Sequence, residues 1–274
     1  MHTLDTVMQS VSLANRLTVE KAGGVSLACD DKKLPTDEKN TAYRAAEVFF
    51  REAGVAGGAR ITIEKRIPYE AGLGSASADA AGVLAALDLL YGTRLGSEKL
   101  CALALSVGAD VPFCLVGGAC RATGIGEILT PVPPLKTGAF LIVKPPHGVS
   151  TAVAYRAVDG LGAPVLPDGG KMAEAVAAGE LARIGALCEN TFTACCGDEE
   201  SLAILAALRK AGALGASMSG SGSALFGVFE NEEKAAAALP PLRREGRFAA
   251  VALPVAEGVT ILESSDRENK KTEV

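Results

Sequence analysis

The alternation of apolar and polar positions divides the chain into strands and helices. Residues 7–20 alternate as a strand does, whereas residues 40–53 repeat with the period of an amphipathic helix that stops at Gly54. Residues 60–67 return to strand alternation, with isoleucines on one face. The first part of the chain is therefore predicted to combine a β-sheet with helices packed against it.

The rest of the chain continues this mixture. Residues 83–91 place apolar side chains on one helical face, and a short helix is expected over residues 97–106. Residues 160–170 are typical of an exposed connector, and residues 264–274 of a frayed polar tail. Further strands are expected at 115–122, 127–131, 139–144, 213–217, 223–229 and 247–255, and further helices at 199–211 and 231–239. The pattern predicts an α+β protein with a domain boundary near residues 145–150.

A loop of small residues runs directly into the apolar helix. Gly72 and Gly74 remove Cβ atoms where an anion must approach, Ser75 and Ser77 offer hydroxyls, and the helix dipole adds about half a positive charge. Asp79 is expected to complement this dipole rather than to touch a nucleotide. A tight turn with a good helix cap is the alternative interpretation. No GxxxxGK[ST] sequence occurs, and no GxG triplet has the third glycine of a dinucleotide fingerprint.

Composition restricts the class of protein. A chain of 274 residues that is 49% hydrophobic can bury a large core, in one large domain or two packed ones. The net charge of −5 and the lack of a basic stripe argue against a nucleic-acid partner. Seven cysteines without a CxxC pair, beside only two histidines, indicate free thiols in a reducing compartment rather than zinc ligands or disulfides. With no signal peptide and no membrane-spanning run, we expect a cytoplasmic protein with a small-molecule partner and no membrane partner.

Two further glycine-rich segments complete a pattern of three. GADVPF at 108–113 and MSGSGS at 218–223 follow the loop at 68–79. In order and spacing these segments resemble the three motifs of the GHMP kinase superfamily, and HTLDTVMQSV from His2, with GADVPF, is most similar to its 4-diphosphocytidyl-2-C-methyl-D-erythritol kinases. The resemblance implies an α+β GHMP kinase fold, with an N-terminal S5-like α/β domain at 1–147 and a C-terminal ferredoxin-like domain at 148–274.

The same resemblance assigns roles to residues. It implies that ATP, with Mg²⁺, phosphorylates the 2-hydroxyl of a cytidine diphosphate-linked polyol in the non-mevalonate isoprenoid pathway. Asp110 matches the catalytic Asp that accepts or orients the proton of the substrate hydroxyl. His2, Thr151 and Tyr155 match substrate-binding positions, where an aromatic side chain stacks on the base. The ATP-binding residues are expected to be Pro68, Tyr69, Glu70, Ala71, Gly72, Leu73, Gly74, Ser75, Ala76, Ser77 and Ala78. The Mg²⁺ ligands and the oligomeric state are left open.

Other interpretations stand beside these. Without the resemblance, Asp110 reads as a loop residue that caps a turn, Tyr155 as a helix-face aromatic and His2 as a terminal residue. The resemblance also places a strand bearing a Lys ahead of His2, and neither Lys65 nor Lys144 lies in a matching motif. Either that strand lies upstream of the present start, or the chain transfers phosphate slowly. The alternatives are a non-catalytic nucleotide-binding GHMP relative and another GHMP kinase such as homoserine kinase.

Overall fold

The computed structural model describes residues 4–161, 166–264 and 271–274, which form two compact units. The first unit comprises Met1–Leu13, Pro68–Leu73 and Gly118–Ala256, and the second comprises Ala14–Ile67, Gly74–Gly117 and Glu257–Val274. The units alternate along the chain rather than following one cut in the sequence. The expected domains at 1–147 and 148–274 are continuous in sequence and do not coincide with these units, so they stay a prediction.

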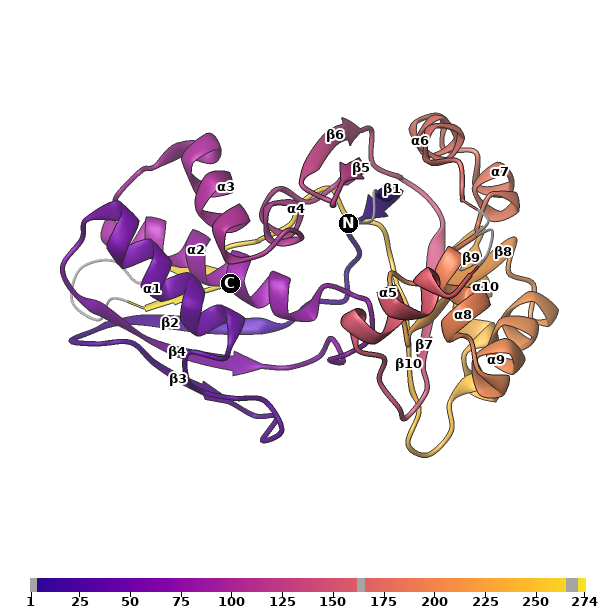
Figure 1. The fold of residues 1–274 in the computed structure, drawn as a ribbon, viewed down its shortest axis with the longest axis horizontal. Helices are drawn as coiled ribbons and strands as arrows, with labels where there is room; N and C mark the ends of the chain where they lie inside the picture. Colours follow the sequence, from indigo (N-terminus) through magenta and orange to yellow (C-terminus); the bar gives the residue numbers. More distant parts are fainter. Residues whose placement is uncertain (1–3, 162–165, 265–270) are drawn as a thin grey trace. The chain divides into compact units, whose positions relative to one another are not determined.

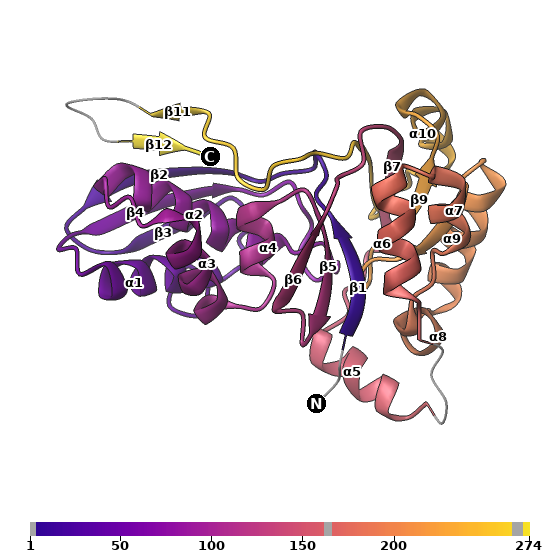
Figure 2. The same ribbon diagram turned by 90° about the horizontal axis from the view of Figure 1, so that it is seen from above.

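In the second unit, helices α1 and α2 lie against one face of a five-stranded sheet, and α3 packs on these two helices (Figures 1 and 2). The strand order is β11-β12-β2-β4-β3, with β3 parallel to β4 and the other neighbours antiparallel. The elements of this unit are β2 (Arg16–Ala22), β3 (Ser26–Cys29), α1 (Thr41–Ala53), β4 (Gly58–Glu64), α2 (Ser75–Tyr91), α3 (Gly96–Val107), α4 (Val111–Val116), β11 (Glu263–Ser264) and β12 (Lys271–Glu273).

The alternation seen in the sequence builds the core of this unit. On β4, Ile61 and Ile63 point to the helices and are buried, while the residues that alternate with them, Arg60, Thr62 and Glu64, are exposed. Helix α1 adds the buried ring of Phe49. This helix begins after Asn40, whose side chain caps its first turn, and ends at Gly54 in the left-handed region with φ 64°. The predicted helix over residues 40–53 is therefore confirmed.

The first unit holds two sheets, ordered β1-β5-β6 and β10-β7-β9-β8, in which all neighbouring strands are antiparallel. On β9, Leu225 and Phe229 pack with helices α9 and α10, whereas Val228 packs with α6 and α7. Helices therefore cover both faces of the four-stranded sheet. The elements are β1 (Leu4–Gln9), β5 (Ala119–Gly124), β6 (Ile128–Val132), β7 (Ala139–Lys144), α5 (Thr151–Asp159), α6 (Gly169–Ala178), α7 (Leu181–Ala186), α8 (Thr191–Cys196), α9 (Glu199–Lys210), β8 (Gly215–Met218), β9 (Leu225–Phe229), α10 (Glu232–Ala238), the 3-10 helix η1 (Pro240–Leu242) and β10 (Phe248–Ala252).

Several expectations about local structure are wrong. Residues 7–20 form two strands, because the chain leaves the first sheet after Gln9 and enters the second at Arg16. The strand expected over residues 115–122 begins only at Ala119, since Val111–Val116 is helical. Pro112 suits the first turn of that helix because it needs no N–H partner there.

The last residues of the expected tail form a strand, although their composition is polar. Residues 271–273 pair with β2, and Val274 is buried beside Leu17 of that strand. Residues 265–270 of the expected tail lie outside the described residues. The expected connector over residues 160–170 ends where α6 begins at Gly169, and residues 162–165 of it are likewise outside the description.

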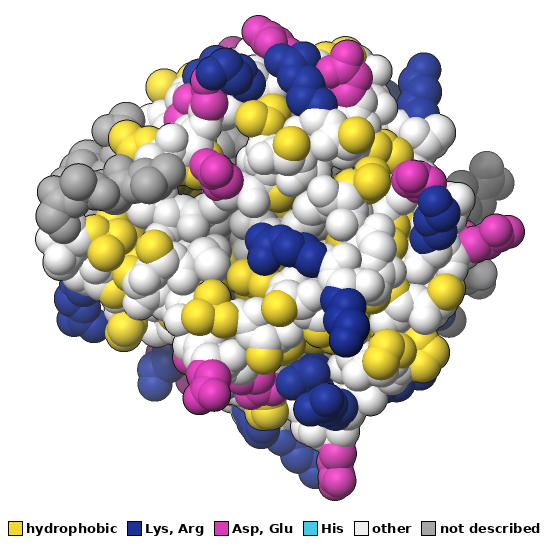
Figure 3. Space-filling model, turned by 90° about the vertical axis from the view of Figure 1, so that its right-hand side faces the viewer, with side chains coloured by type: hydrophobic (Ala, Val, Ile, Leu, Met, Phe, Trp, Pro, Cys, Tyr) yellow, Lys and Arg dark blue, Asp and Glu magenta, His cyan; other side chains and the backbone are white. Residues whose placement is uncertain are grey.

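On the face that Figure 3 shows, Lys and Arg side chains lie among Asp, Glu and uncharged side chains. The expectation of no nucleic-acid partner stays a prediction. Within the described residues, no helix combines the length and apolarity needed to cross a bilayer.

Candidate active site

In the second unit, the glycine loop leads into a helix start that no side chain caps. Gly74 precedes α2 with a φ of 66°, a left-handed conformation that favours glycine. No side chain caps this end of the helix, so its first N–H groups keep their capacity to bind an acceptor. An uncapped helix start that follows a glycine turn is suited to an anion such as a phosphate.

A buried ion pair joins the two ends of this loop. The Lys65 ammonium lies 2.6 Å from an Asp79 carboxylate oxygen and donates to the Ser75 hydroxyl, also at 2.6 Å. The Lys65 and Asp79 side chains are only 9% and 5% exposed. Asn15 donates to the other Asp79 oxygen and accepts the N–H groups of residues 66 and 67. The segment before the loop and the first turns of α2 are therefore fastened together.

This cluster changes the interpretation of two residues. Asp79 does not complement the helix dipole as expected, because its carboxylate is turned to Lys65 and Asn15. Burial raises the pKa of Asp79, although Lys65 acts in the opposite direction. The Ser75 hydroxyl, expected to be offered to an anion, donates to the Ile67 carbonyl and accepts from Lys65. Only the backbone N–H of Ser75 is left for that role.

Asp110 stands at the start of α4 but does not cap it. Its side chain makes no capping hydrogen bond and pairs with no side chain among the described residues. The side chain reaches solvent, yet partial desolvation by the surrounding protein raises the pKa of its carboxyl. The turn-capping interpretation of Asp110 therefore finds no support in its contacts.

In the first unit, the opening part of the glycine loop packs against the third glycine-rich segment. The Ser219 hydroxyl donates to the Gly72 carbonyl at 2.7 Å, and the N–H of Ala224 donates to the Ala71 carbonyl at 3.0 Å. A Cβ atom on Gly72 would lie 2.0 Å from the Ser219 carbonyl oxygen. The glycine at this position is therefore required by close backbone approach as well as by its φ of 67°.

Two of the three predicted substrate-binding residues belong to helix α5 of the same unit. Thr151 is exposed, and its hydroxyl lies 3.1 Å from that of Ser221 in the glycine-rich segment. Tyr155 is half-buried and meets Phe192 edge to face, with ring centroids 5.1 Å apart. The third residue, His2, lies outside the described residues and stays a prediction from the resemblance.

Sequence reasoning missed the residues that support these loops. Asn15 and Lys65 lie outside the three motifs, and their pairing with α2 is visible only in the fold. Asn190 likewise donates to the carbonyls of Met218 and Gly220. Its position before a helix predicts only the capping bond that it also makes. Among the described residues, no group of three or more His, Cys, Asp or Glu is arranged for a metal ion.

Two family models match the chain on either side of its middle. The family described as GHMP kinases N terminal domain matches residues 40–118, and the one described as GHMP kinases C terminal matches residues 172–247. The chain belongs to the GHMP kinases, and the predicted fold is confirmed.

Individual relatives show which kinases within this family the chain is similar to. The chain is 40% identical to a 4-diphosphocytidyl-2-C-methyl-D-erythritol kinase of Carboxydothermus hydrogenoformans, over 85% of this chain and 82% of that protein. It is 42% identical to the kinase of that name in Pelotomaculum thermopropionicum, over 85% and 83%. A crystal structure of 4-(cytidine 5'-diphospho)-2C-methyl-D-erythritol kinase superposes with a TM-score of 0.75 at 37% identity, covering 92% of this chain and 90% of that one. A homoserine kinase from Cytophaga hutchinsonii superposes at 0.78 but is 21% identical, so it shows the fold alone.

Proposed function

We propose that this chain transfers the γ-phosphoryl group of ATP to the 2-hydroxyl of 4-diphosphocytidyl-2-C-methyl-D-erythritol. The observation that carries the proposal is the Asp110 carboxylate, which is accessible, uncommitted and raised in pKa at the start of α4. The choice of substrate is supported by relatives of that name at about 40% identity. The homoserine kinase likeness supports no second substrate, because it extends only to the fold.

The nucleotide is assigned to the residues from Pro68 to Ala78. Phosphoryl transfer needs the phosphates cradled and their charge offset, and the uncapped start of α2 supplies N–H donors and a positive dipole end. Mg²⁺ is the cation that usually accompanies ATP, and it commonly keeps waters and phosphate oxygens as most of its ligands. That mode of binding suits a chain whose described residues offer no acidic cluster for a metal.

Asp110 is assigned as the base. As the substrate oxygen forms its bond to the γ-phosphorus, the bond from that phosphorus to the bridging oxygen breaks and ADP leaves. The proton of the hydroxyl passes to the Asp110 carboxylate. A pKa raised by desolvation makes this carboxylate a better proton acceptor than an ordinary surface Asp. Its lack of a capping bond leaves both oxygens for this task.

The cytidine end of the substrate is assigned to Tyr155 and Thr151, together with His2. An aromatic ring gives a base a stacking surface worth about 1–3 kcal/mol. Phe192 supports one edge of Tyr155, and Ser221 holds the Thr151 hydroxyl. All seven cysteines are free, which fits our proposal that the reaction takes place in the reducing cytoplasm.

An assay of ADP release tests the proposal. Purified chain is given ATP and Mg²⁺ with 4-diphosphocytidyl-2-C-methyl-D-erythritol, and separately with homoserine. We expect turnover with the first compound only, and we expect Asp110→Asn to lower it at least about a hundredfold while ATP still binds. Turnover with homoserine alone, or full activity of Asp110→Asn, would contradict the assignment. ATP binding without turnover of either compound would support the non-catalytic alternative.

A further inference from the structure

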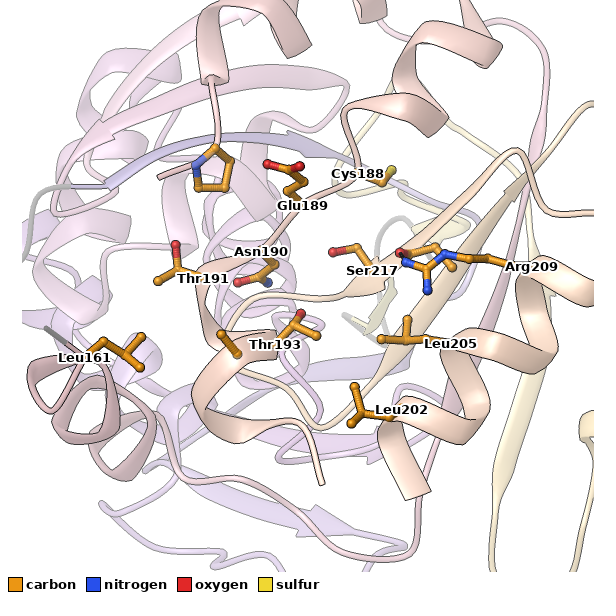
Figure 4. A pocket seen from close by; sticks show the side chains of 13 residues that line it. Leu161, Cys188, Glu189, Asn190, Thr191, Thr193, Leu202, Leu205, Arg209 and Ser217 are labelled. Carbon is orange, nitrogen blue, oxygen red and sulfur yellow. Dashed lines mark hydrogen bonds between the residues drawn. The ribbon is translucent and has the colours of Figure 1, made fainter. Parts of the chain in front are cut away.

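A pocket in the first unit lies outside every segment that the sequence motifs mark. It has a volume of about 450 Å³, is open to solvent on one side, and is lined by Leu161, Pro167, the residues before and within α8, α9 and strand β8 (Figure 4). Volumes of this size are typical of sites for small molecules. None of the residues assigned to ATP, to the base or to the cytidine lines it.

One side of the pocket is apolar. Leu202 and Leu205 project into it from α9 (Figure 4), and Ala216 of β8 also lines it. Leu205 and Ala216 are buried, whereas Leu202 is 54% exposed although it is a large aliphatic side chain. A ligand with an apolar portion would cover Leu202 and gain from the area removed from water.

The other side gathers polar groups with unused bonding capacity. Ser217 is only 4% exposed, its hydroxyl points into the pocket, and this hydroxyl makes no hydrogen bond to another described residue (Figure 4). The Thr193 hydroxyl is buried without a hydrogen-bond partner. Arg209 gives one N–H to the Ala216 carbonyl at 2.8 Å, and no carboxylate in the described part of the chain pairs with its guanidinium. Buried polar groups normally have partners, so the Ser217 and Thr193 hydroxyls point to a missing acceptor, and the exposed Arg209 side chain supplies a positive charge beside them.

The charges define what that acceptor is. Arg209 contributes a positive charge, and burial raises the pKa of the neighbouring Cys188 thiol to about 12, so the thiol is neutral. Glu189 supplies a negative charge, but its carboxylate is directed away from Ser217 and Arg209 (Figure 4). The polar end therefore suits an anionic head that accepts from a guanidinium and hydroxyls.

The wall of the pocket is fixed before any ligand binds. Asn190 accepts the N–H of Phe192, and its amide nitrogen donates to the carbonyls of Met218 and Gly220, both at 2.8 Å. Its hydrogen-bonding groups are thus already engaged with protein, and the segment that carries Thr193 is tied to the end of β8. A preformed pocket needs little ordering when it is filled.

We propose that this pocket binds a small amphiphilic anion, consisting of a phosphate or carboxylate head on a short apolar chain. The head lies between Arg209, Ser217 and Thr193, and the chain lies along Leu202 and Leu205. A cation is disfavoured by the guanidinium, and a purely apolar molecule would leave the two hydroxyls without partners.

Calorimetry with defined probes tests the site on the full chain. Hexyl phosphate and hexanoate are titrated separately, each in the presence of excess ATP so that the proposed nucleotide loop is filled. We expect one molecule of at least one probe to bind per chain, and hexanol and inorganic phosphate to bind at least about tenfold more weakly, because each lacks one half of the match. Which of the two probes binds more tightly identifies the head group.

Matched variants locate the binding. Arg209→Met should weaken the probe at least about tenfold, as expected for loss of a charge-assisted hydrogen bond. Lys210→Met removes the same charge from the next residue of α9, which is exposed as Arg209 is but does not line the pocket, and should change nothing. Ser217→Ala, a smaller change, should weaken binding several-fold even if Arg209→Met does not fold. Equal affinity in Ser217→Ala and wild type, or loss of probe binding when ATP is added, would overturn the proposal. Neither result depends on whether the chain turns over the proposed substrate.

Discussion

Replacing Lys65 by Met should be among the most damaging single changes to the second unit. At an effective dielectric constant of about 20, unit charges at the observed 2.6 Å attract by about 6 kcal/mol. Part of this attraction offsets the cost of burying both groups. Removing one member of such a pair typically costs about 3–5 kcal/mol, since the other charge stays buried and unpaired. Among the described residues, Asn15 is then the only side chain that donates to Asp79.

The loss should depend on pH in a defined direction. Burial already raises the pKa of Asp79, and without Lys65 this pKa rises further. The folded variant then binds a proton more readily than the unfolded chain. Its stability therefore increases as the pH falls and decreases as the pH rises. The destabilisation should be larger at pH 7 than at pH 5.

Urea unfolding followed by circular dichroism measures this effect, and hydrogen exchange of β2 and β4 amides reports the second unit specifically. Arg60→Met is the control, because Arg60 forms an exposed pair with Glu20 at 3.8 Å in the same sheet and should matter by about 1 kcal/mol or less. Asp79→Asn and the double variant complete a cycle in which the double variant should be less destabilised than the sum of the singles. A Lys65→Met midpoint equal to that of Arg60→Met would refute the reasoning.

Three further changes have defined outcomes. Asp110→Asn should abolish most activity but raise the free energy of unfolding at pH 7. The raised pKa of Asp110 means that its ionisation weakens the fold as pH rises, so a lower stability of the variant at pH 7 would contradict this. Gly72→Ala should weaken ATP binding in calorimetry, since its Cβ meets the Ser219 carbonyl, whereas Gly92→Ala has a similar φ but open space and should bind ATP normally. Val274→Asp should speed hydrogen exchange of β2 amides, and unchanged exchange would mean that the burial of Val274 contributes nothing.

Local patterns predicted much of this fold because local forces decide many of its elements. Helix α1 has its cap at Asn40 and its stop at Gly54 within the segment itself, and α9 and β7 lie within a residue of their expected bounds. The errors arise where a distant partner decides. Val111–Val116 has a strand-like composition but packs as a helix against α2 and α3. The polar sequence of residues 271–274 predicts a frayed tail, but residues 271–273 form a strand because β2 offers them backbone hydrogen-bond partners.

In the candidate site, too, some residues could be predicted from local sequence and others depend on distant partners. Gly72 and Gly74 could be predicted because a positive φ and a close approach restrict the residue type strongly. Lys65, Asn15 and Asp79 could not be paired from the sequence, because a buried ion pair depends on where three separate segments meet. The pocket beside Arg209 has no sequence signature, since its polar groups come from α8, α9 and β8 and form no motif.

The strand β12 has a consequence for how the molecule is made. Its partner β2 leaves the ribosome early, whereas residues 271–273 are synthesised after nearly all the rest of the described chain. Until then, the N–H and C=O groups on that side of β2 lack their final partners, and an open strand edge of this kind can pair with other chains. A pause in translation before residue 271 should therefore increase the demand for chaperones. A domain fused after Val274 that keeps residues 271–273 from pairing with β2 should lower the yield of folded protein, even though it contacts none of the proposed catalytic residues.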